Sequence, residues 1–296
     1  MMNGNRMRYI AGHEVDKRKW DECINAAKNG LVYHSAMGLD MMSDNWNAVI
    51  VDDYKAVVPL PWRKKFFVPY YYRVPFIPQG GIIGEFDPAL FGDLKRTIFS
   101  KVRFGDLLLN FDNAAFARHI SARPLINMVL KLVEYPNVIS SYKRGLESRL
   151  KKAVKKGFNY EKEKDLKLAV ALFRKQYASK IQRVRNEDYE RFTAFCLYLQ
   201  ERGNAVVRKV TDSKGKLMAI AILLMDRNRI YNMMNTVLPE GRGKSANHYL
   251  FDQLIVEFAG TGLMLDFGGS EVPWIRKFYA EFGAENQPYY WFRKIV

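Results

Sequence analysis

The stretch Leu263–Gly283, LMLDFGGSEVPWIRKFYAEFG, combines a carboxylate, a glycine bend and a helix start. The apolar run before Asp266 predicts a short buried strand, and Pro273 suits the first turn of the helix that follows. The bend between strand and helix consists of Phe267, Gly268, Gly269 and Ser270. Such a junction leaves backbone N–H groups and one carboxylate at the carboxyl end of a strand, where open α/β sheets commonly bind ligands.

A second candidate for ligand binding is a short glycine-containing loop in front of a helical pattern from about Ala246 to Ala259. The loop residues are Gly241, Arg242, Gly243, Lys244 and Ser245. Two glycines would let backbone N–H groups approach a ligand, and the helix N-terminus behind them favours anions, so the loop could cradle phosphates. A flexible solvent-exposed turn remains the alternative, since short loops of this composition often match by chance.

Four further side chains are candidates for ligand contact. Tyr231 and Asn235 lie on one face of the predicted strand before the loop, where ligand contact and sheet packing are both compatible with their types. His34, next to Tyr33 in a predicted loop, is the histidine to test. The four histidines of the chain show no metal-ligand spacing, so the sequence predicts no metal site.

Composition limits the classes of protein that fit. The 296 residues carry a formal net charge of +16, which favours polyanions such as nucleic acid, phosphorylated cofactors or an anionic membrane surface. No stretch reaches the roughly 20 apolar residues of a membrane span, so we expect a cytoplasmic protein that could touch a membrane peripherally. Cys23 and Cys196 lie far apart in apolar patterns, which argues against a disulfide scaffold or a zinc site.

A basic helix is predicted from Ser141 to about Lys156, with a narrow apolar stripe on one side. Its candidate polyanion contacts are Arg149, Lys151, Lys152 and Lys155. A solvated charged face is the usual explanation of such a run, but six net charges in one helix also suit phosphate contact without base reading.

The elements around these residues repeat in the two halves of the chain. Each half contains a helix, antiparallel strands, another helix and a strand that ends in an acid, Asp112 or Asp266. Within the first half, Pro59 and Pro61 are expected to end a strand that begins at Lys55. We therefore predict two related α/β units, residues 1–140 and 141–296, with the basic helix at the start of the second.

Three segments resemble a known family. They are RLKKAVKKGF (149–158), HYLFDQLIVEFAGTGLMLDFGGS (248–270) and IRKFYAEFGAE (275–285). The second half resembles the GNAT N-acyltransferase fold, and the whole chain resembles its duplicated form, found in Fem-type peptidoglycan aminoacyltransferases and CelD-like acyltransferases. The resemblance implies an α/β (α+β) fold of two tandem GNAT-like domains with mixed, mostly antiparallel central sheets, the first domain being degenerate.

The resemblance also implies an activity, the transfer of an acyl group from acyl-CoA or acetyl-CoA to an amine, without a metal. The loop Gly241–Ser245 would then hold the donor phosphates, and ligands would bind between the domains and near Asp266. Asp266 could anchor the amine, take its proton or cap the bend, and the other expected catalytic residues are Tyr231 and Tyr279. Expected substrate contacts are Tyr33, His34, Asn235, Gly268, Gly269, Ser270 and Lys277.

Two alternatives to an acyl-CoA enzyme follow from the same resemblance. A Fem-type enzyme would take an aminoacyl-tRNA donor and act on a cell-wall precursor; the charge of +16 favours it. Tyr279 disfavours it, because Fem-type enzymes carry lysine at that place. The fold could also serve as a non-catalytic binding module in envelope or polysaccharide biosynthesis.

Overall fold

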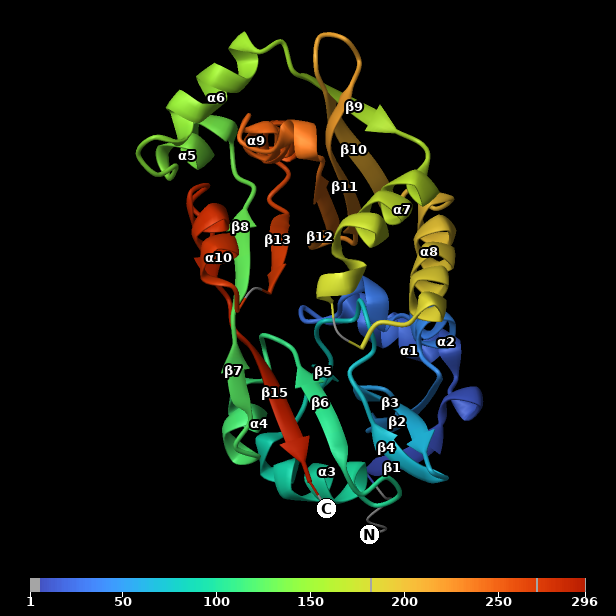
Figure 1. The fold of residues 1–296 in the computed structure, drawn as a ribbon. Helices are drawn as coiled ribbons and strands as arrows, with labels where there is room; N and C mark the ends of the chain where they lie inside the picture. Colours follow the sequence, from blue (N-terminus) through green and yellow to red (C-terminus); the bar gives the residue numbers. More distant parts are fainter. Residues whose placement is uncertain (1–5, 182, 270, 296) are drawn as a thin grey trace. The chain divides into compact units, whose positions relative to one another are not determined.

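The computed structural model describes residues 6–181, 183–269 and 271–295, and its elements are labelled in Figure 1. The chain divides into two compact units, Met1–Ile126 with Gln287–Val296, and Asn127–Asn286. The boundary therefore lies near residue 126 rather than at 140, and the last strand belongs to the first unit instead of the second. The reason is strand pairing, since the segment after residue 126 and the C-terminal segment each enter the sheet of the other half.

The first unit contains an eight-stranded sheet with the order β1-β2-β3-β4-β6-β15-β7, in which β5 pairs with β3. Its strands are β1 (Met7–Ala11), β2 (Asn45–Val51), β3 (Ala56–Lys65), β4 (Val68–Tyr71), β5 (Ile83–Gly84), β6 (Gly105–Leu109), β7 (Arg123–Leu125) and β15 (Tyr289–Lys294). Its helices are α1 (Lys17–Ala26), α2 (Ala36–Met42), α3 (Phe91–Ile98) and α4 (Ala114–His119). Every pairing in this sheet is antiparallel except β4 with β6.

The strand β3 runs through both prolines that were expected to end it. Pro59 and Pro61 lie opposite Ala48 and Trp46 of β2. On its other edge β3 pairs with β5 only at Ala56–Val57 and with β4 only from Trp62 onward. Between these two contacts, at residues 58–61, no described strand pairs with this edge of β3. The prolines, which lack an N–H group, therefore cost the sheet no hydrogen bond there.

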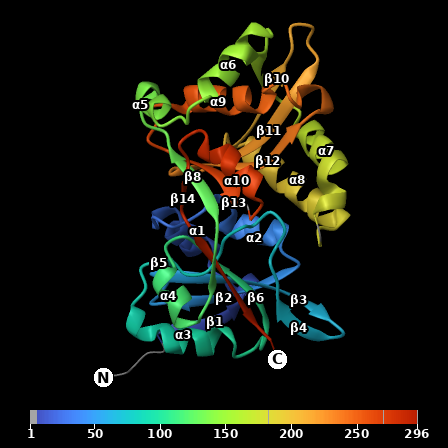
Figure 2. The same cartoon turned by 60° about the vertical axis from the view of Figure 1, so that its left-hand side comes forward.

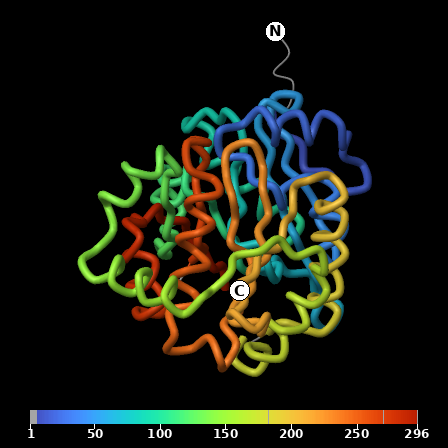
Figure 3. The backbone as a smooth tube through the Cα atoms, turned by 90° about the horizontal axis from the view of Figure 1, so that it is seen from above, coloured from blue at the N-terminus to red at the C-terminus, as the bar shows by residue number. Residues whose placement is uncertain are grey.

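The second unit contains a seven-stranded sheet with the order β14-β8-β13-β12-β11-β10-β9. Its strands are β8 (Asn127–Lys131), β9 (Asn159–Glu163), β10 (Ala205–Thr211), β11 (Leu217–Met225), β12 (Arg229–Val237), β13 (Met264–Gly269) and β14 (Glu285–Asn286). Its helices are α5 (Tyr135–Ser140), α6 (Leu146–Lys155), α7 (Leu166–Tyr177), α8 (Asn186–Gln200), α9 (Ala246–Phe258) and α10 (Pro273–Ala280). The meander β10–β11–β12 confirms the sequence-based expectation, and Figure 3 follows the chain through it.

The basic helix begins later than predicted. Residues 141–145 form a turn, and Gly145 before α6 has φ +96°, a left-handed conformation that interrupts any helix arriving from Ser141. The helix packs on α9, with Leu146 and Ala153 buried.

The two units share one topological feature, a single parallel pair in an otherwise antiparallel sheet. In the first unit β4 and β6 pair at one position, Tyr71 opposite Gly105. In the second, β12 and β13 pair over three positions, from Arg229 opposite Met264 to Tyr231 opposite Asp266. The expected class, two tandem α/β units with mixed and mostly antiparallel sheets, is therefore confirmed.

Candidate active site

The parallel strands of the second unit separate after a short contact. Their pairing ends at Tyr231 opposite Asp266, whereas β12 continues for six residues to Val237. On its other side β12 stays paired with β11 as far as Val237 opposite Ala219. Among the described residues, the backbone of β12 beyond Tyr231 thus has no strand partner on the side of β13, where an extended ligand could use its hydrogen-bonding groups.

The glycine-containing loop follows directly on this open edge and leads into α9. Gly243 has φ +69° and no heavy atom near the position of a Cβ, so the loop is open to solvent there. Gly241 has another role, since a Cβ would lie 2.3 Å from the carbonyl oxygen of Met218 and close packing requires glycine. The first N–H groups of α9 have no acceptor within the described part of the chain. These groups are available to an anion at the helix N-terminus.

The cations of the loop are partly engaged. Arg242 donates from its guanidinium to the Gln176 side-chain oxygen of α7, and Gln176 in turn donates to the Val237 carbonyl at 3.4 Å. Lys156 donates to the Lys244 carbonyl at 3.4 Å, which brings a lysine that follows α6 to the loop. Lys244 itself has no ion-pair partner among the residues that the structure describes. The loop thus carries positive charge beside free N–H groups, as phosphate binding requires.

Tyr279 of α10 lies at the point where β12 and β13 separate. Its ring packs against Phe267 of β13, with centroids 4.7 Å apart, and the side chain is only 9% exposed. Burial raises the pKa of its phenol, the neighbouring Tyr177 and Asp266 raise it further, and Asn232 opposes the shift by hydrogen bonding. Since Asn232 is the first β12 residue beyond the paired segment, Tyr279 lies beside the start of the open edge.

Asp266 is engaged in a buried ion pair. Its Oδ2 accepts from Arg229 at 3.2 Å and from the Asn127 amide at 3.1 Å, while Oδ1 accepts from the Gly268 N–H at 2.9 Å. Burial raises the pKa of Asp266, and these three donors oppose that shift. With both oxygens occupied, Asp266 joins β8, β12 and the β13 bend, and it combines the expected bend-capping role with an ion pair that the sequence did not predict.

The hydroxyl of Tyr231 donates to Asp226 in the turn before β12, away from the open edge. Tyr231 was expected to be a catalytic residue, and this contact is compatible with a positioning role. Asn235 lies further along β12, and its buried side-chain Nδ2 has no hydrogen-bond partner in the described chain. An orphaned buried donor is unusual and points to a ligand or water at that position.

The remaining predicted contacts around the bend are distributed differently. Gly268 has φ +88°, and a Cβ there would meet only the Asn232 carbonyl at 3.9 Å, so the bend faces the open edge. Gly269 ends β13 and is exposed, and Ser270 lies outside the described residues. Lys277 is exposed on α10, two residues and therefore roughly 200° around the helix from the buried Tyr279. Phe267, the neighbour of Gly268 in the bend, thus packs on Tyr279, whereas Lys277 lies on a different side of α10.

The four basic residues expected to contact a polyanion differ in their surroundings. Arg149 forms an ion pair with Glu281, which also lies 3.2 Å from His248, so this guanidinium fastens α6 to α10. Lys151 has only a loose 4.0 Å contact with Glu147. Lys152 and Lys155 are exposed, and neither has an acidic partner within the described ranges.

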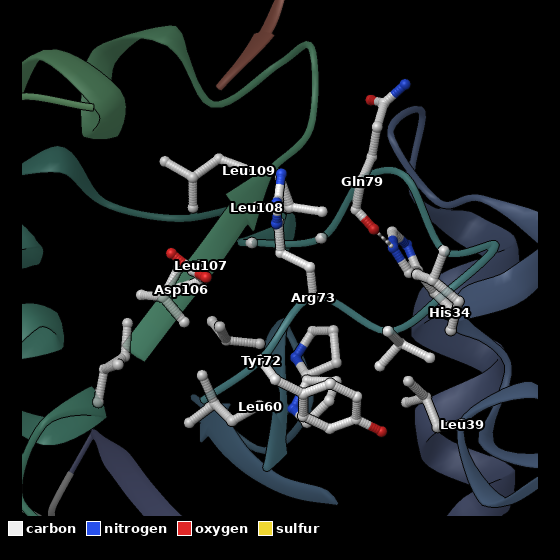
Figure 4. Close-up of a pocket in the computed structure, with 18 of the residues that line it drawn as sticks. His34, Leu39, Leu60, Tyr72, Arg73, Gln79, Asp106, Leu107, Leu108 and Leu109 are labelled. Atoms are coloured by element: carbon white, nitrogen blue, oxygen red, sulfur yellow. Dashed lines mark hydrogen bonds between the residues drawn. The ribbon is translucent and has the colours of Figure 1, made fainter. Parts of the chain in front are cut away.

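His34 lines a pocket in the first unit, shown in Figure 4. The pocket lies at the uncovered edge of β3, and its lining includes Pro59, Pro61, Arg73, Gln79 and Leu108. His34 is fully buried; its Nε2 donates to the Gln79 carbonyl at 2.8 Å, and its Nδ1 has no partner among the described residues. Burial lowers the pKa of His34 to about 4, so the ring is neutral at physiological pH.

Tyr33 contributes to the same region only indirectly. It is fully buried, and its ring stands at 90° to that of His34 with centroids 5.0 Å apart. It supports the histidine rather than lining the pocket.

Sequence reasoning missed several residues that build these sites. Tyr177, Asn232 and Gln176 belong to no motif. Asn232 lies on β12 itself, whereas Tyr177 and Gln176 reach the open edge through the packing of α7 on β12. Arg229 and Asn127 lie 37 and 139 residues from Asp266 in the chain. An isolated arginine at the start of a buried strand was the one available signal, since buried charges are normally paired.

No group of three or more His, Cys, Asp or Glu side chains in the described ranges could hold a metal ion. No helix formed by the described residues is both long enough and apolar enough to cross a bilayer.

Comparison with known proteins agrees with the geometry. Residues 140–276 match the family model of the acetyltransferase (GNAT) domain. The fold is similar to the crystal structure of FemX, with a TM-score of 0.69 at 13% identity and 97% of each chain covered. It is also similar to a tandem GNAT protein from the clavulanic acid biosynthesis pathway, with a TM-score of 0.58 at 10% identity, covering 97% of this chain and 98% of the other.

A third similar structure is L-PGS from Bacillus licheniformis, with a TM-score of 0.55 at 12% identity, covering 93% of this chain and 90% of the other. At such identities the likeness concerns the fold alone. No curated protein matches the chain by sequence.

Proposed function

We propose that the chain is an acyltransferase that transfers an acyl group from a coenzyme A thioester to an amine, because residues 140–276 match the family model of the acetyltransferase (GNAT) domain and the fold is similar to those of FemX and a tandem GNAT protein. The observation that carries the proposal is the open edge of β12. Beyond Tyr231 no described strand pairs with β12 on the side of β13, and β12 leads into the Gly241–Ser245 loop and the N-terminus of α9.

An acyl-CoA donor has the chemistry that this arrangement could recognise. Its pantetheine arm contains amide groups that can pair with free strand backbone, and its diphosphate would be held by the loop and helix N-terminus. Lys244 and Lys156 supply positive charge at that end. The side-chain Nδ2 of Asn235, which has no partner among the described residues, could donate a hydrogen bond to a carbonyl of the pantetheine arm.

Tyr279 is proposed as the proton donor to the leaving group. The amine nitrogen attacks the thioester carbonyl, a C–N bond forms, and the C–S bond breaks as the thiolate takes the phenolic proton. The ammonium proton of the product passes to water, and the phenol regains its proton from solvent. The raised pKa of Tyr279 keeps the phenol protonated at neutral pH, which this role requires.

Asp266 is proposed to position rather than to react. Its ion pair with Arg229 and its bond from the Gly268 N–H hold the bend that faces Tyr279. His34 remains the proposed acceptor contact in the first unit, where its unpaired Nδ1 could accept a hydrogen bond from an acceptor group.

Thermal unfolding with acetyl-CoA tests the donor assignment. A ligand present at 100 times its Kd adds about 2.7 kcal/mol, which corresponds to a rise in Tm of several degrees. Gly243→Glu places a carboxylate in the loop and should abolish the rise. Gly203→Glu is the matched control, because Gly203 also has positive φ and open surroundings but lies before β10, away from the loop. Equal shifts in the wild type and Gly243→Glu would remove the loop from the donor site.

A second donor class is favoured by one observation, the exposed and unpaired Lys152 and Lys155 of α6. We propose aminoacyl-tRNA as the alternative donor, held by its phosphates. Lys152→Glu with Lys155→Glu should then weaken tRNA retention on a filter, whereas Lys167→Glu with Lys175→Glu on α7 should change it little. Equal retention by the two double variants would contradict the tRNA alternative. A shift in Tm with acetyl-CoA would then leave acyl-CoA as the donor.

A further inference from the structure

The tip of the β3–β4 hairpin exposes two adjacent phenylalanines. Phe66 is 86% exposed and Phe67 is 95% exposed, and Val68 beside them is 47% exposed. Phe66 and Phe67 are the most exposed large apolar side chains in the described part of the chain. Contiguous exposed apolar side chains on a soluble domain usually mark an interaction surface.

The hairpin extends beyond the sheet that carries it, as Figure 2 shows. The pairing of β3 with β2 ends at Trp62, and β4 contacts β6 only at Tyr71. From Arg63 to Tyr70 the chain is therefore a two-stranded ribbon, paired only with itself. Its end is free to contact a surface without disturbing the core.

The turn holds the phenylalanines in an unfavourable backbone conformation. Phe66 and Phe67 form a two-residue connection between Lys65 and Val68, with φ of +49° and +65°. Hairpins of this kind strongly prefer Asn-Gly, because bulky side chains are disfavoured at positive φ. Two phenylalanines at these positions cost stability while their rings remain in water. Strain without an internal compensation is characteristic of functional positions.

The ribbon is also purely cationic. Between Trp62 and Tyr71 the chain contains Arg63, Lys64 and Lys65 and no acid. Arg63 is anchored at the base, paired with Asp44 at 3.1 Å and stacked on the Tyr72 ring at 3.6 Å. Lys64 and Lys65 are exposed and have no acidic partner among the described residues. Their positive charge is thus available to an external anion.

A neighbouring loop, which ends in Phe104, contacts the base of the hairpin and is also basic. The Phe104 ring is nearly parallel to that of Tyr70, with centroids 6.5 Å apart, and the Phe104 carbonyl accepts from the Tyr71 N–H at 3.1 Å. Lys101 and Arg103 precede Phe104 and are exposed. Half-buried aromatic rings between apolar and charged side chains suit the boundary between headgroups and acyl chains.

From these contacts we propose that the hairpin tip, Lys64–Val68, docks on an anionic lipid bilayer, with Phe66 and Phe67 inserted at the headgroup boundary. Lysines beside exposed aromatics are complementary to a surface that is anionic outside and apolar beneath, which a protein face or a second copy of this cationic chain is not. The proposal is independent of the acyl donor, because the hairpin lies in the first unit and the donor loop in the second.

Flotation with lipid vesicles tests the docking. Wild-type protein should bind vesicles of phosphatidylcholine that contain about 30% phosphatidylglycerol, because the lysines are attracted to anionic headgroups. It should bind pure phosphatidylcholine vesicles weakly. Phe66→Asn with Phe67→Gly should lower binding to the anionic vesicles roughly tenfold or more. This pair is the preferred turn sequence, so the variant should fold with an equal or higher Tm. Lys64→Gln with Lys65→Gln should lower binding to the anionic vesicles about fivefold for each lysine removed.

The control is Val154→Asn, which removes an exposed apolar side chain from the other strongly basic surface, helix α6. Its vesicle binding should equal that of the wild type. Unchanged binding of the Phe66→Asn/Phe67→Gly variant would overturn the proposal. So would a dimer of the wild type that dissociates in this variant during analytical ultracentrifugation, since the tip would then bind a second copy.

A fluorescent label gives an independent measurement of insertion. Cys23 and Cys196 are buried, so Phe67→Cys can be labelled selectively with an environment-sensitive dye. Anionic vesicles should shift its emission to the blue, while the same label on Ser213→Cys in the second unit should show no shift. Equal emission changes at both positions would contradict insertion of the tip.

Discussion

Tyr279 combines three properties that an acid in acyl transfer needs. Its phenol is protonated at neutral pH, it lies beside Asn232 at the start of the free edge of β12, and its ring packs against Phe267 and Phe251, whose centroids lie 4.7 and 5.9 Å away. A fixed donor loses little entropy when the reaction begins. The same tyrosine stands where the Fem-type resemblance led us to expect lysine, so the difference concerns the chemistry and leaves the framework intact.

Replacing Tyr279 by phenylalanine should separate its chemical role from its packing role. We expect kcat to fall about 100-fold, because one positioned acid typically contributes that much, while KM for the donor stays the same. The Tm should change little, since the ring contacts remain. Steady-state kinetics and thermal unfolding measure both quantities. A variant with wild-type kcat would assign the proton transfer to another group or to solvent.

Asp266 differs from Tyr279, because both of its carboxylate oxygens accept hydrogen bonds from the protein at the proposed ligand site. Asp266→Asn should lower the free energy of unfolding by about 3–5 kcal/mol, because the buried Arg229 guanidinium would lose the charge of the Asp266 carboxylate. Urea unfolding measures the loss, and Glu147→Gln, which removes an exposed carboxylate from α6, is the control. A fall in kcat with unchanged stability would instead support a role as the base.

The sequence identified residues near the site better than it identified their roles. The Gly241–Ser245 loop, Asp266, Gly268 and Tyr279 all lie around the open edge, because strand, bend and helix follow each other in the chain. The partners Arg229, Asn127 and Tyr177 come from distant segments. Their contacts depend on sheet order and helix packing, which no local pattern determines.

At the scale of elements, the parallel contact between β4 and β6 depends on a single glycine. Gly105 has φ +128°, and a Cβ would lie 2.2 Å from the Tyr71 carbonyl oxygen. No side chain can occupy that space unless the two strands move apart. The β4–β6 contact lies in the sheet that also forms the His34 pocket, since Leu107 and Leu109 of β6 line it.

Gly105→Ala should therefore lower the free energy of unfolding by about 2–4 kcal/mol, through backbone strain and the forced separation of β4 and β6. Gly92→Ala is the control, because a Cβ on Gly92 of α3 would meet only the flexible Arg96 guanidinium at 3.7 Å. That variant should gain about 0.4–1 kcal/mol. Urea midpoints compare the two, and equal midpoints would show that β4 and β6 tolerate the separation.

Element boundaries were predictable where local chemistry decided them. Asp16 caps α1 by accepting from the Arg18 and Lys19 N–H groups, as its type and position suggested. The prediction that Pro59 and Pro61 end β3 was wrong, because the effect of a proline depends on whether a neighbouring strand would bond to its missing N–H group. Whether that edge is covered is a property of the sheet and cannot be read from the strand alone.

At the scale of the whole molecule, each half contributes a strand to the other half's sheet. The segment 123–131 passes from β7 in the first sheet to β8 in the second, and the segment 285–294 passes from β14 in the second sheet to β15 in the first. The sequence suggested the duplication but not this exchange, because the order of helices and strands is the same whether or not the last strand returns.

Strand exchange predicts which fragment of the chain folds by itself. Residues 127–286 contain every strand of the second sheet, whereas residues 141–296 lack β8, which lies between β13 and β14, and carry β15 without its partners β6 and β7. Without β8, the edge of β13 that carries Asp266 also loses Asn127. The fragment 127–286 should therefore unfold cooperatively on heating and give dispersed amide resonances, while 141–296 should aggregate or unfold without a clear transition. Comparable folding of both fragments would mean that α9, α7 and the β9–β13 strands suffice for the second unit.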